Sequence, residues 1–116
     1  MSIAGDLIRG HTDAIILARL ERGDSYGYEI NKMISTLSSG RFELKEATLY
    51  TAFKRLEEAG AIASYWGDSG AGARRRYYTI TPAGRECCHR LRLEWQETKE
   101  IMDKLLEEEE HPCGKS

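Results

Sequence analysis

The chain contains a tetrapeptide whose residue types are those of a catalytic serine site. The sequence GDSG, at residues 67–70, surrounds Ser69 with the residues that flank the nucleophilic serine of chymotrypsin-like proteases. A serine nucleophile needs a histidine base and an acid that orients it, but His11, His89 and His111 all lie elsewhere in the sequence. Glycine, aspartate and serine are also typical turn residues. We therefore interpret GDSG as a turn and predict no catalytic residue, with a hydrolase that uses Ser69 as an alternative.

The cysteines and histidines toward the C-terminal end do not have the spacing of a metal site. The candidate ligands are Cys87, Cys88, His89, His111 and Cys113. Structural zinc sites use spacings such as C-x2-C and H-x3-H, and neither occurs among them. Three cysteines, two of them adjacent, also make a poor disulfide framework. We predict reduced thiols, no metal site and no cofactor.

Three consecutive arginines, Arg74, Arg75 and Arg76, are the clearest candidates for binding a charged partner. On a strand, successive side chains point to opposite faces, so the three would project to both sides of a hairpin. A protein core cannot bury such charges unpaired. Held within a Debye length of about 8 to 10 Å, they repel one another, and a polyanion relieves that repulsion. We predict that they bind phosphate groups.

The composition is that of a water-soluble globular protein. Of the 116 residues, 41% are hydrophobic and 31% are charged, and the length suits one domain. No run of 18 apolar residues occurs, and the first 13 residues carry Asp6, Arg9 and Asp13 where a signal peptide needs an apolar core. We therefore expect a cytoplasmic protein without a membrane partner.

The net charge of −2 is unevenly distributed along the chain. Residues 1–85 carry 12 Lys and Arg against 10 Asp and Glu, a net charge of +2, whereas residues 86–116 carry 5 against 9, a net charge of −4. A slightly basic body with a local basic patch can bind a polyanion, because the field over one face matters more than the total charge.

Hydrophobic spacing predicts three short helices in the first 60 residues. The first begins at residue 11 or 12 and ends before Gly23, and the second begins near Ser25, a good N-cap, and ends at the SSG of residues 38–40. After the extended link RFELK, a third helix runs from Glu46 until Gly60 ends it.

The third helix is amphipathic, with a polar side suited to a ligand. Its apolar side chains recur at helical spacing on one side. The polar residues on or beside the opposite side are Thr48, Thr51, Lys54 and Arg55. Tyr50 flanks the apolar stripe, and two positions stay open to it: it faces a ligand, or it packs under the following hairpin.

The segments AIASYWG and ARRRYYTIT have strand composition and are separated by the turn cluster DSGAG, which predicts a β-hairpin. Trp66 is expected to pack beneath it. Thr81 and Pro82 then suit the N-cap and first position of a long helix. We expect that helix to span residues 82–110, followed by a disordered tail at residues 111–116.

The apolar residues of the last helix step by three and four, as in a coiled-coil seam. A helix of about 28 residues is about 42 Å long, more than a domain of this size spans, so a second chain is the natural partner of the seam. The residues predicted at this dimer interface are Leu91, Trp95, Thr98, Met102 and Leu105. Trp95 should anchor the dimer, and paired indoles in a cleft would also bind a flat aromatic effector.

The predicted order of elements is that of a winged helix-turn-helix, in which the third helix enters the major groove and the hairpin, or wing, follows the DNA backbone. The fold class is mainly α (α+β): a winged helix-turn-helix domain over residues 1–81 with a two-stranded wing, and a long C-terminal dimerisation helix. A winged-helix module that binds proteins without touching DNA is the alternative function.

Four motifs, spread over about residues 9–95, resemble the PadR-like family of bacterial transcription regulators, of the short class with a single C-terminal dimerisation helix. They are RGHTDAIILARLERGDSYGYEI, ELKEATLYTAFKRLEEAGAIASYWGD, RRRYYTITPAGRE and the LEW that ends at Trp95. The chain departs from the commoner family pattern at Glu46, where many members have proline.

The resemblance implies a homodimeric DNA-binding regulator, usually a repressor, that is often released by a small aromatic molecule. The operator would be double-stranded DNA with two inverted half-sites. Carried over to this sequence, the residues on the recognition helix would be Thr48, Tyr50, Thr51 and Lys54. Those on the wing would be Arg74, Arg75 and Arg76.

Overall fold

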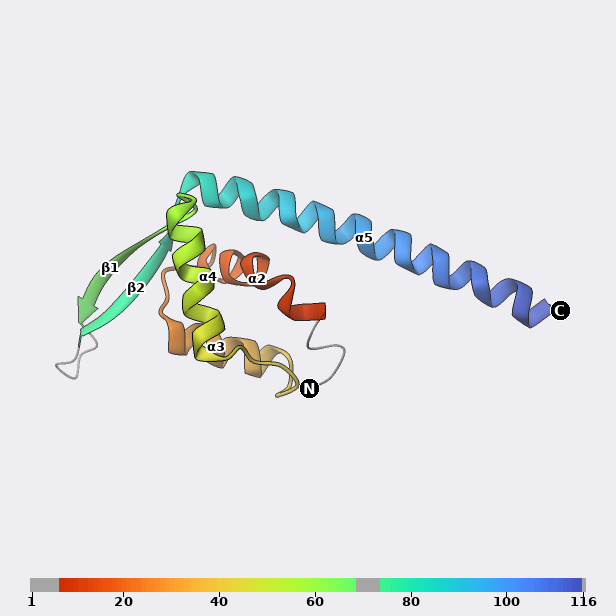
Figure 1. Ribbon diagram of the computed structural model, residues 1–116, viewed down its shortest axis with the longest axis horizontal. Coiled ribbons are helices and arrows are strands. Elements are labelled where there is room, and N and C mark those ends of the chain that lie inside the picture. Colours follow the sequence, from red (N-terminus) through yellow and green to blue (C-terminus); the bar gives the residue numbers. More distant parts are fainter. Residues whose placement is uncertain (1–6, 69–73, 116) are drawn as a thin grey trace.

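The computed structural model describes residues 7–68 and 74–115, with side chains described up to residue 107. Its elements are helices α2 (Thr12–Leu20), α3 (Gly27–Leu37) and α4 (Glu46–Glu58), strands β1 (Ile62–Asp68) and β2 (Arg74–Ile80), and helix α5 (Pro82–Lys115). The three short helices form one cluster, the hairpin lies at one side of it, and α5 projects far beyond it at the other (Figure 1). The molecule measures 67 × 29 × 21 Å because of this projecting helix.

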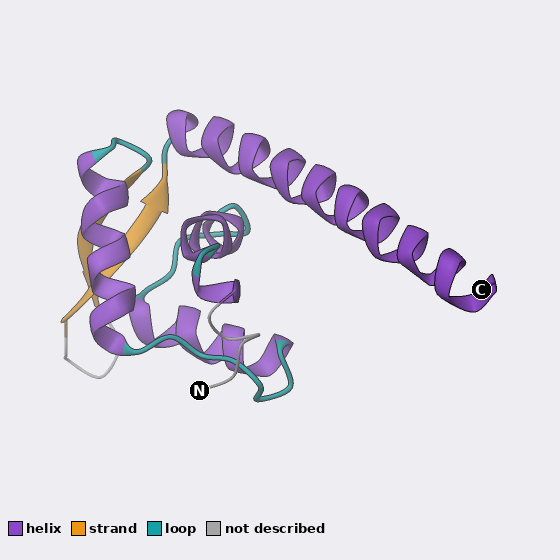
Figure 2. Ribbon diagram, turned by 45° about the vertical axis from the view of Figure 1, so that its right-hand side comes forward, coloured by secondary structure: helices purple, strands orange, loops and turns teal. Residues whose placement is uncertain are grey.

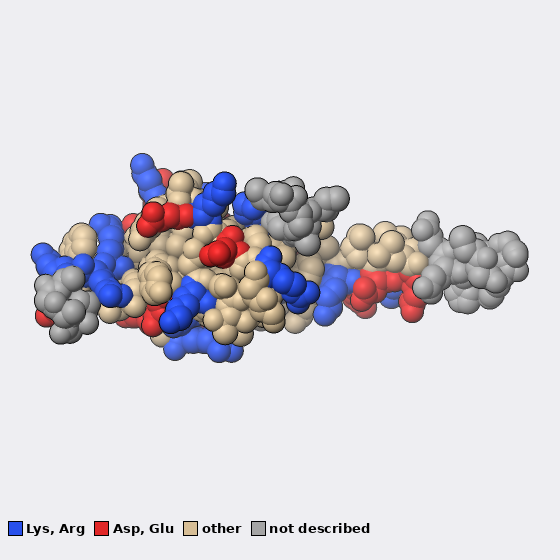
Figure 3. All heavy atoms as spheres, turned by 90° about the horizontal axis from the view of Figure 1, so that it is seen from below, with Lys and Arg blue, Asp and Glu red and all other residues tan. Residues whose placement is uncertain are grey.

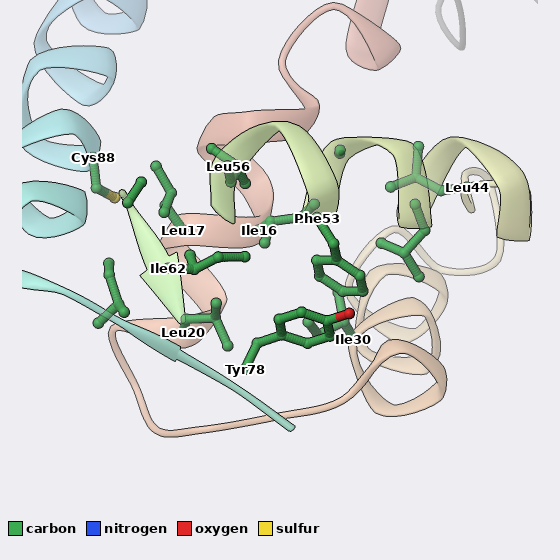
Figure 4. Close-up of a cluster of buried hydrophobic side chains, with 14 of the residues drawn as sticks. Ile16, Leu17, Leu20, Ile30, Leu44, Phe53, Leu56, Ile62, Tyr78 and Cys88 are labelled. Atoms are coloured by element: carbon green, nitrogen blue, oxygen red, sulfur yellow. The ribbon is translucent and has the colours of Figure 1, made fainter. Parts of the chain in front are cut away.

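A single hydrophobic core joins the three short helices to the hairpin (Figure 4). Helix α2 contributes Ile16, Leu17 and Leu20, all at most 1% exposed. From α4, the ring of Phe53 stacks on Tyr78 of β2 with the ring centroids 4.0 Å apart. The core therefore fixes the third helix and the hairpin relative to each other, and the elements predicted from the sequence are confirmed in order and type.

Helix α3 does not begin where the sequence suggested. Its N-cap is Tyr26, and Ser25, predicted to be the cap, is fully buried outside the helix. The backbone of Ser25 is paired with that of Tyr78: the N–H of Ser25 donates to the Tyr78 carbonyl at 3.2 Å, and the N–H of Tyr78 donates to the Ser25 carbonyl at 2.8 Å. The Ser25 hydroxyl donates to the side chain of Glu29 at 2.5 Å. This contact with β2 holds the residue extended, so the prediction was wrong.

The hairpin has the predicted antiparallel pairing and alternation. Its register runs from Ile62 opposite Ile80 to Asp68 opposite Arg74. Tyr78 and Ile80 are buried, whereas Arg74, on the same face but at the far end, is exposed. Asp68 of the predicted turn is the last residue of β1, and residues 69–72, which include Ser69, lie outside the described residues.

Helix α5 starts at the base of the hairpin with the predicted cap. The hydroxyl of Thr81 accepts a hydrogen bond from the Gly84 N–H at 3.0 Å and donates one to the Gly60 carbonyl at 2.6 Å. At Gly84 a side chain would meet the Ala61 carbonyl oxygen at 2.1 Å, so only glycine permits this close approach. The start of α5 is thereby held against the end of α4.

The last helix is longer than the sequence suggested. It continues to Lys115, so residues 111–115, predicted to belong to a disordered tail, are helical. An established helix is extended at low cost, because each added residue brings one more backbone hydrogen bond. Within the described part of the chain, no helix has the length and apolar character needed to cross a membrane.

Candidate nucleic-acid interface

Helix α4 presents a polar face away from the core, as its sequence predicted. Leu49, Phe53 and Leu56 point into the core, each at most 4% exposed. On the other side Thr48 is half-buried, and Thr51 and Lys54 are exposed. The helix stands at the edge of the domain next to the hairpin (Figure 2). Its hydroxyls and the Lys54 ammonium can therefore reach a ligand that docks on this edge.

Arg55 lies on the side of α4 that faces α2. Its guanidinium forms an ion pair with the carboxylate of Asp13, and both side chains are partly exposed. The two line a shallow cavity of about 540 Å³ together with Thr48 and Thr51. An exposed ion pair of this kind contributes at most about 1 kcal/mol. Arg55 can therefore exchange Asp13 for a phosphate at small cost.

A second groove, of about 640 Å³, separates α4 and the start of α3 from the hairpin. Its lining is aromatic and basic, and consists of Tyr26, Gly27, Tyr28, Tyr50, Trp66, Arg74, Arg75 and Arg76. The three predicted wing arginines thus share one groove with Tyr50 of α4. On the face shown in Figure 3, Lys and Arg side chains gather at the end of the molecule that is opposite the projecting part of α5.

Tyr50 combines the two positions that the sequence left open. Its ring packs edge-on against Phe53, with the centroids 5.6 Å apart, but the side chain remains 46% exposed. The hydroxyl lies close over Gly27, where a Cβ atom would be only 2.8 Å away. Tyr50 therefore forms part of the groove floor and still presents its ring edge to a ligand.

The wing arginines lie over aromatic rings. The guanidinium carbon of Arg74 is 5.2 Å from the centroid of the Trp66 ring, and that of Arg76 is 5.9 Å from it. On the other face of the hairpin, Arg75 lies 4.5 Å from the Tyr26 ring centroid. The separation of Arg74 and Arg76 from Arg75 by face confirms the strand alternation predicted for these residues.

Trp66 lies on the core-facing side of the hairpin, as the sequence suggested, but it lies near the tip and is 55% exposed rather than packed. The register places it directly opposite Arg76, and the guanidinium groups of Arg74 and Arg76 lie over its ring. Tyr28, at 69% exposure, is another groove residue that sequence reasoning missed. Strand alternation could have placed Trp66 beside the arginines, but only with the register known.

Two tyrosines of the hairpin and one thiol of α5 have raised pKa values. The hydrogen bond that Tyr65 donates to Asp24, at 2.6 Å, raises the pKa of its phenol. Burial raises the pKa of Tyr78, and likewise that of the Cys88 thiol. Neither phenol therefore adds a negative charge to the hairpin. Cys87 and Cys88 are free thiols, and the described residues hold no cluster of three His, Cys, Asp or Glu placed to bind a metal.

The predicted seam of α5 divides into two parts. Leu91 is half-buried and packs against the domain's own core, next to the buried Cys88. Beyond it Trp95 is 48% exposed, and Thr98, Met102 and Leu105 are also exposed. The ring of Trp95 contacts His11 edge-on at 5.2 Å, beside an apolar cavity of about 320 Å³.

Comparison with known proteins gives consistent matches. The family described as "Transcriptional regulator PadR-like family" matches residues 16–90. A protein of Lysinibacillus sphaericus is 46% identical over 105 residues, which cover 90% of this chain and 96% of that protein.

Solved structures match as well. A transcriptional regulator from Clostridium thermocellum is 47% identical, with a TM-score of 0.80 over 89% of this chain and 97% of its own. A PadR family transcription regulator from Clostridium difficile is 37% identical, with a TM-score of 0.72 over 83% of this chain and 98% of its own. Such proteins are transcription regulators rather than enzymes, which removes the hydrolase alternative. The chain belongs to the PadR-like family of transcriptional regulators.

Proposed function

We propose that the protein is a homodimeric repressor that binds a double-stranded DNA operator with two inverted half-sites. The observation that carries this proposal is the groove between α4 and the wing, because three wing arginines line it together with Tyr50 of α4. The exposed polar residues Thr51 and Lys54 lie on the same helix. In a winged helix-turn-helix the recognition helix enters the major groove while the wing follows the backbone. One duplex can touch both elements here.

Helix α4 and the wing would contact different groups of the DNA. Thr48, Thr51 and Lys54 would reach base edges and nearby phosphates from α4, with Tyr50 beside them. The wing arginines would contact phosphates, which positions the protein without reading sequence. Arg55 would join them after leaving Asp13.

The exposed part of the α5 seam supports the dimer. Ile101, Met102, Leu105 and Leu106 are each 47–59% exposed on a helix that projects beyond its own domain. Contiguous exposed apolar surface of this kind marks a protein interface. A two-fold dimer built on it would present two α4 helices, so half-site centres should lie about 34 to 36 Å apart or at a multiple of that distance.

A small aromatic effector would bind beside Trp95. The supporting observation is that half of the indole is exposed next to an apolar cavity bordered by Ile8, His11 and Leu91. In a dimer the second copy would close this space and create a site for a flat ring. Binding there would change the separation of the two α4 helices and release the operator.

The contribution of the wing to DNA binding can be measured from the salt dependence of the binding constant. Arg74→Ala should weaken binding to all DNA sequences alike, because removing one phosphate-binding cation reduces the slope of log K against log salt by about 0.9. For a dimer altered at both wings the slope should fall by about two units, read from fluorescence anisotropy at several salt concentrations. Arg90→Ala, the same change on α5, is the matched control. An unchanged slope for Arg74→Ala would count against the proposal.

The recognition role of α4 can be separated from general DNA affinity. Thr51→Val keeps the side-chain shape but removes the hydroxyl, so discrimination between the operator and a single-base variant should fall by about 1 to 3 kcal/mol at one position. Competition binding with a set of operator variants measures this. Thr36→Val, also an exposed threonine but at the end of α3, should leave discrimination unchanged. Equal discrimination by Thr51→Val and wild type would contradict the role.

The dimer seam can be tested by placing a charge in it. Met102→Glu should separate the chains, since a buried carboxylate without a partner is costly. Sedimentation velocity should then show a species near the 13.2 kDa of one chain, with weaker operator binding. Gln96→Glu adds the same charge on the polar side of α5 and should remain dimeric. A dimeric Met102→Glu variant would place the interface elsewhere.

Repression and its release can be followed with a reporter gene under the bound operator. Wild type should silence the reporter, and a flat phenolic compound that quenches tryptophan fluorescence should restore expression. Trp95→Leu should silence it equally but respond at least tenfold less to the compound. Activation of the reporter by wild type would exclude repression, and an unchanged response of Trp95→Leu would remove the proposed site.

A further inference from the structure

Trp66 contacts two of the wing arginines and does not belong to the buried core. The Arg74 and Arg76 guanidinium carbons lie 5.2 and 5.9 Å from its ring centroid, within the range of cation–π attraction. Its side chain is 55% exposed. Its ring lines the groove together with the exposed rings of Tyr28 and Tyr50, so it belongs to an exposed aromatic patch, which points to a role at the surface.

On the other face of the wing, a second aromatic ring contacts the third arginine. Arg75 lies 4.5 Å from the ring centroid of Tyr26 at the start of α3. The Tyr26 ring packs edge-on against Tyr77, at 5.3 Å between centroids, and Tyr77 stacks on Tyr65 at 5.6 Å. The hydroxyl of Tyr65 donates to Asp24. This series of contacts ties the position of Arg75 to the helices of the domain.

A guanidinium group stacked on a ring can still bind a phosphate. Stacking uses the flat face of the group, whereas its N–H donors point outward from the edge in a plane. An arginine held in this way keeps its donors available and has fewer rotamers to lose when DNA binds. The ring also offsets part of the repulsion among three neighbouring cations, because its face carries partial negative charge.

We propose that Trp66 and Tyr26 are positioning residues of the wing, which hold the guanidinium groups of Arg74, Arg75 and Arg76 in place for the DNA backbone before DNA binds. The inference rests on the proposed function, since it assumes that these arginines contact phosphates. It adds that the affinity of the wing depends on two aromatic side chains that act through the arginines.

The three arginines differ in how strongly they depend on a ring. Arg76 has a second partner, because its guanidinium lies 3.4 Å from the carboxylate of Glu57, which accepts a hydrogen bond from Ser64 at 2.6 Å. Among residues 7–68 and 74–115, the Trp66 ring is the one partner of the Arg74 guanidinium. Arg74 should therefore be affected most when Trp66 is replaced.

The test is a mutant cycle on operator affinity at fixed salt. Trp66→Leu should weaken binding about threefold for each wing, hence about tenfold for a dimer, as expected for exposed cation–π contacts. In the Arg74→Ala/Arg76→Ala background the same change should alter affinity less than twofold. If Trp66 instead touched DNA itself, the tenfold loss would persist in that background, and the proposal would be overturned.

A graded series keeps the test independent of folding. Trp66→Tyr and Trp66→Phe retain a ring, so they should fold as wild type, with affinity decreasing from Trp to Phe and again to Leu as the attraction for a cation weakens or disappears. Equal affinity across the series would overturn the proposal. Tyr26→Leu should weaken operator binding in the wild-type background but change it less than twofold in the Arg75→Ala background. If the losses of affinity from the two substitutions are additive, Tyr26 does not act through Arg75 and its positioning role is overturned.

The two proposals fail differently. If wild type shows no salt-dependent binding to operator DNA, the proposed function fails and the positioning role falls with it. If wild type binds and Arg74→Ala lowers the salt slope while Trp66→Leu has the same effect with and without the arginines, only the positioning role is wrong.

Discussion

The contact between Phe53 and Tyr78 is the packing interaction on which the rest of the domain depends. The two rings stack with centroids 4.0 Å apart, and both side chains are at most 3% exposed. Phe53 belongs to α4 and Tyr78 to β2, so this contact sets the position of α4 relative to the wing. Arg76 is two residues from Tyr78 on the same face of β2. The contact between Phe53 and Tyr78 therefore also determines where the wing arginines lie. The backbone pairing of Ser25 with Tyr78 also holds the segment just before α3 against β2.

The electrostatics of the interface rest on weak internal partners. Arg55 faces Asp13, and Arg76 faces Glu57, both as ion pairs at the surface. Such pairs contribute little because water already solvates the charges. Both pairs can be exchanged for phosphates at small cost. A chain with a net charge of −2 can thus present a basic edge.

Helix α5 connects the seam to the DNA-facing elements through a short physical path. Its first turn is capped by Thr81, whose backbone N–H donates to Ala61 at 3.0 Å and whose hydroxyl donates to Gly60. These residues join α4 to β1, and Thr81 directly follows β2. A change in the angle of α5 at the seam would therefore move the base of the wing and the end of α4 together. This is the structural basis for expecting an effector beside Trp95 to alter DNA binding.

The sequence by itself determined the features that depend on neighbours along the chain. Helical spacing identified α2, α3 and α4 and the polar side of α4, and alternation of residues identified the hairpin and the faces of its arginines. The Thr81–Pro82 cap and the apolar seam of α5 are likewise local patterns.

Only the tertiary structure decided what depends on residues distant in sequence. Local propensity favoured Ser25 as a helix cap, but pairing with Tyr78 holds it outside the helix. The side-chain pattern of α4 did not show that Arg55 meets Asp13, 42 residues away. Trp66 is on the hairpin's underside, as the sequence suggested, but the strand register places it near the tip against Arg74 and Arg76, where it stays exposed. At Ser25 a long-range contact outweighed a capping preference of about 1 kcal/mol. The contacts of Arg55 and Trp66 likewise exist only once the core has brought the elements together.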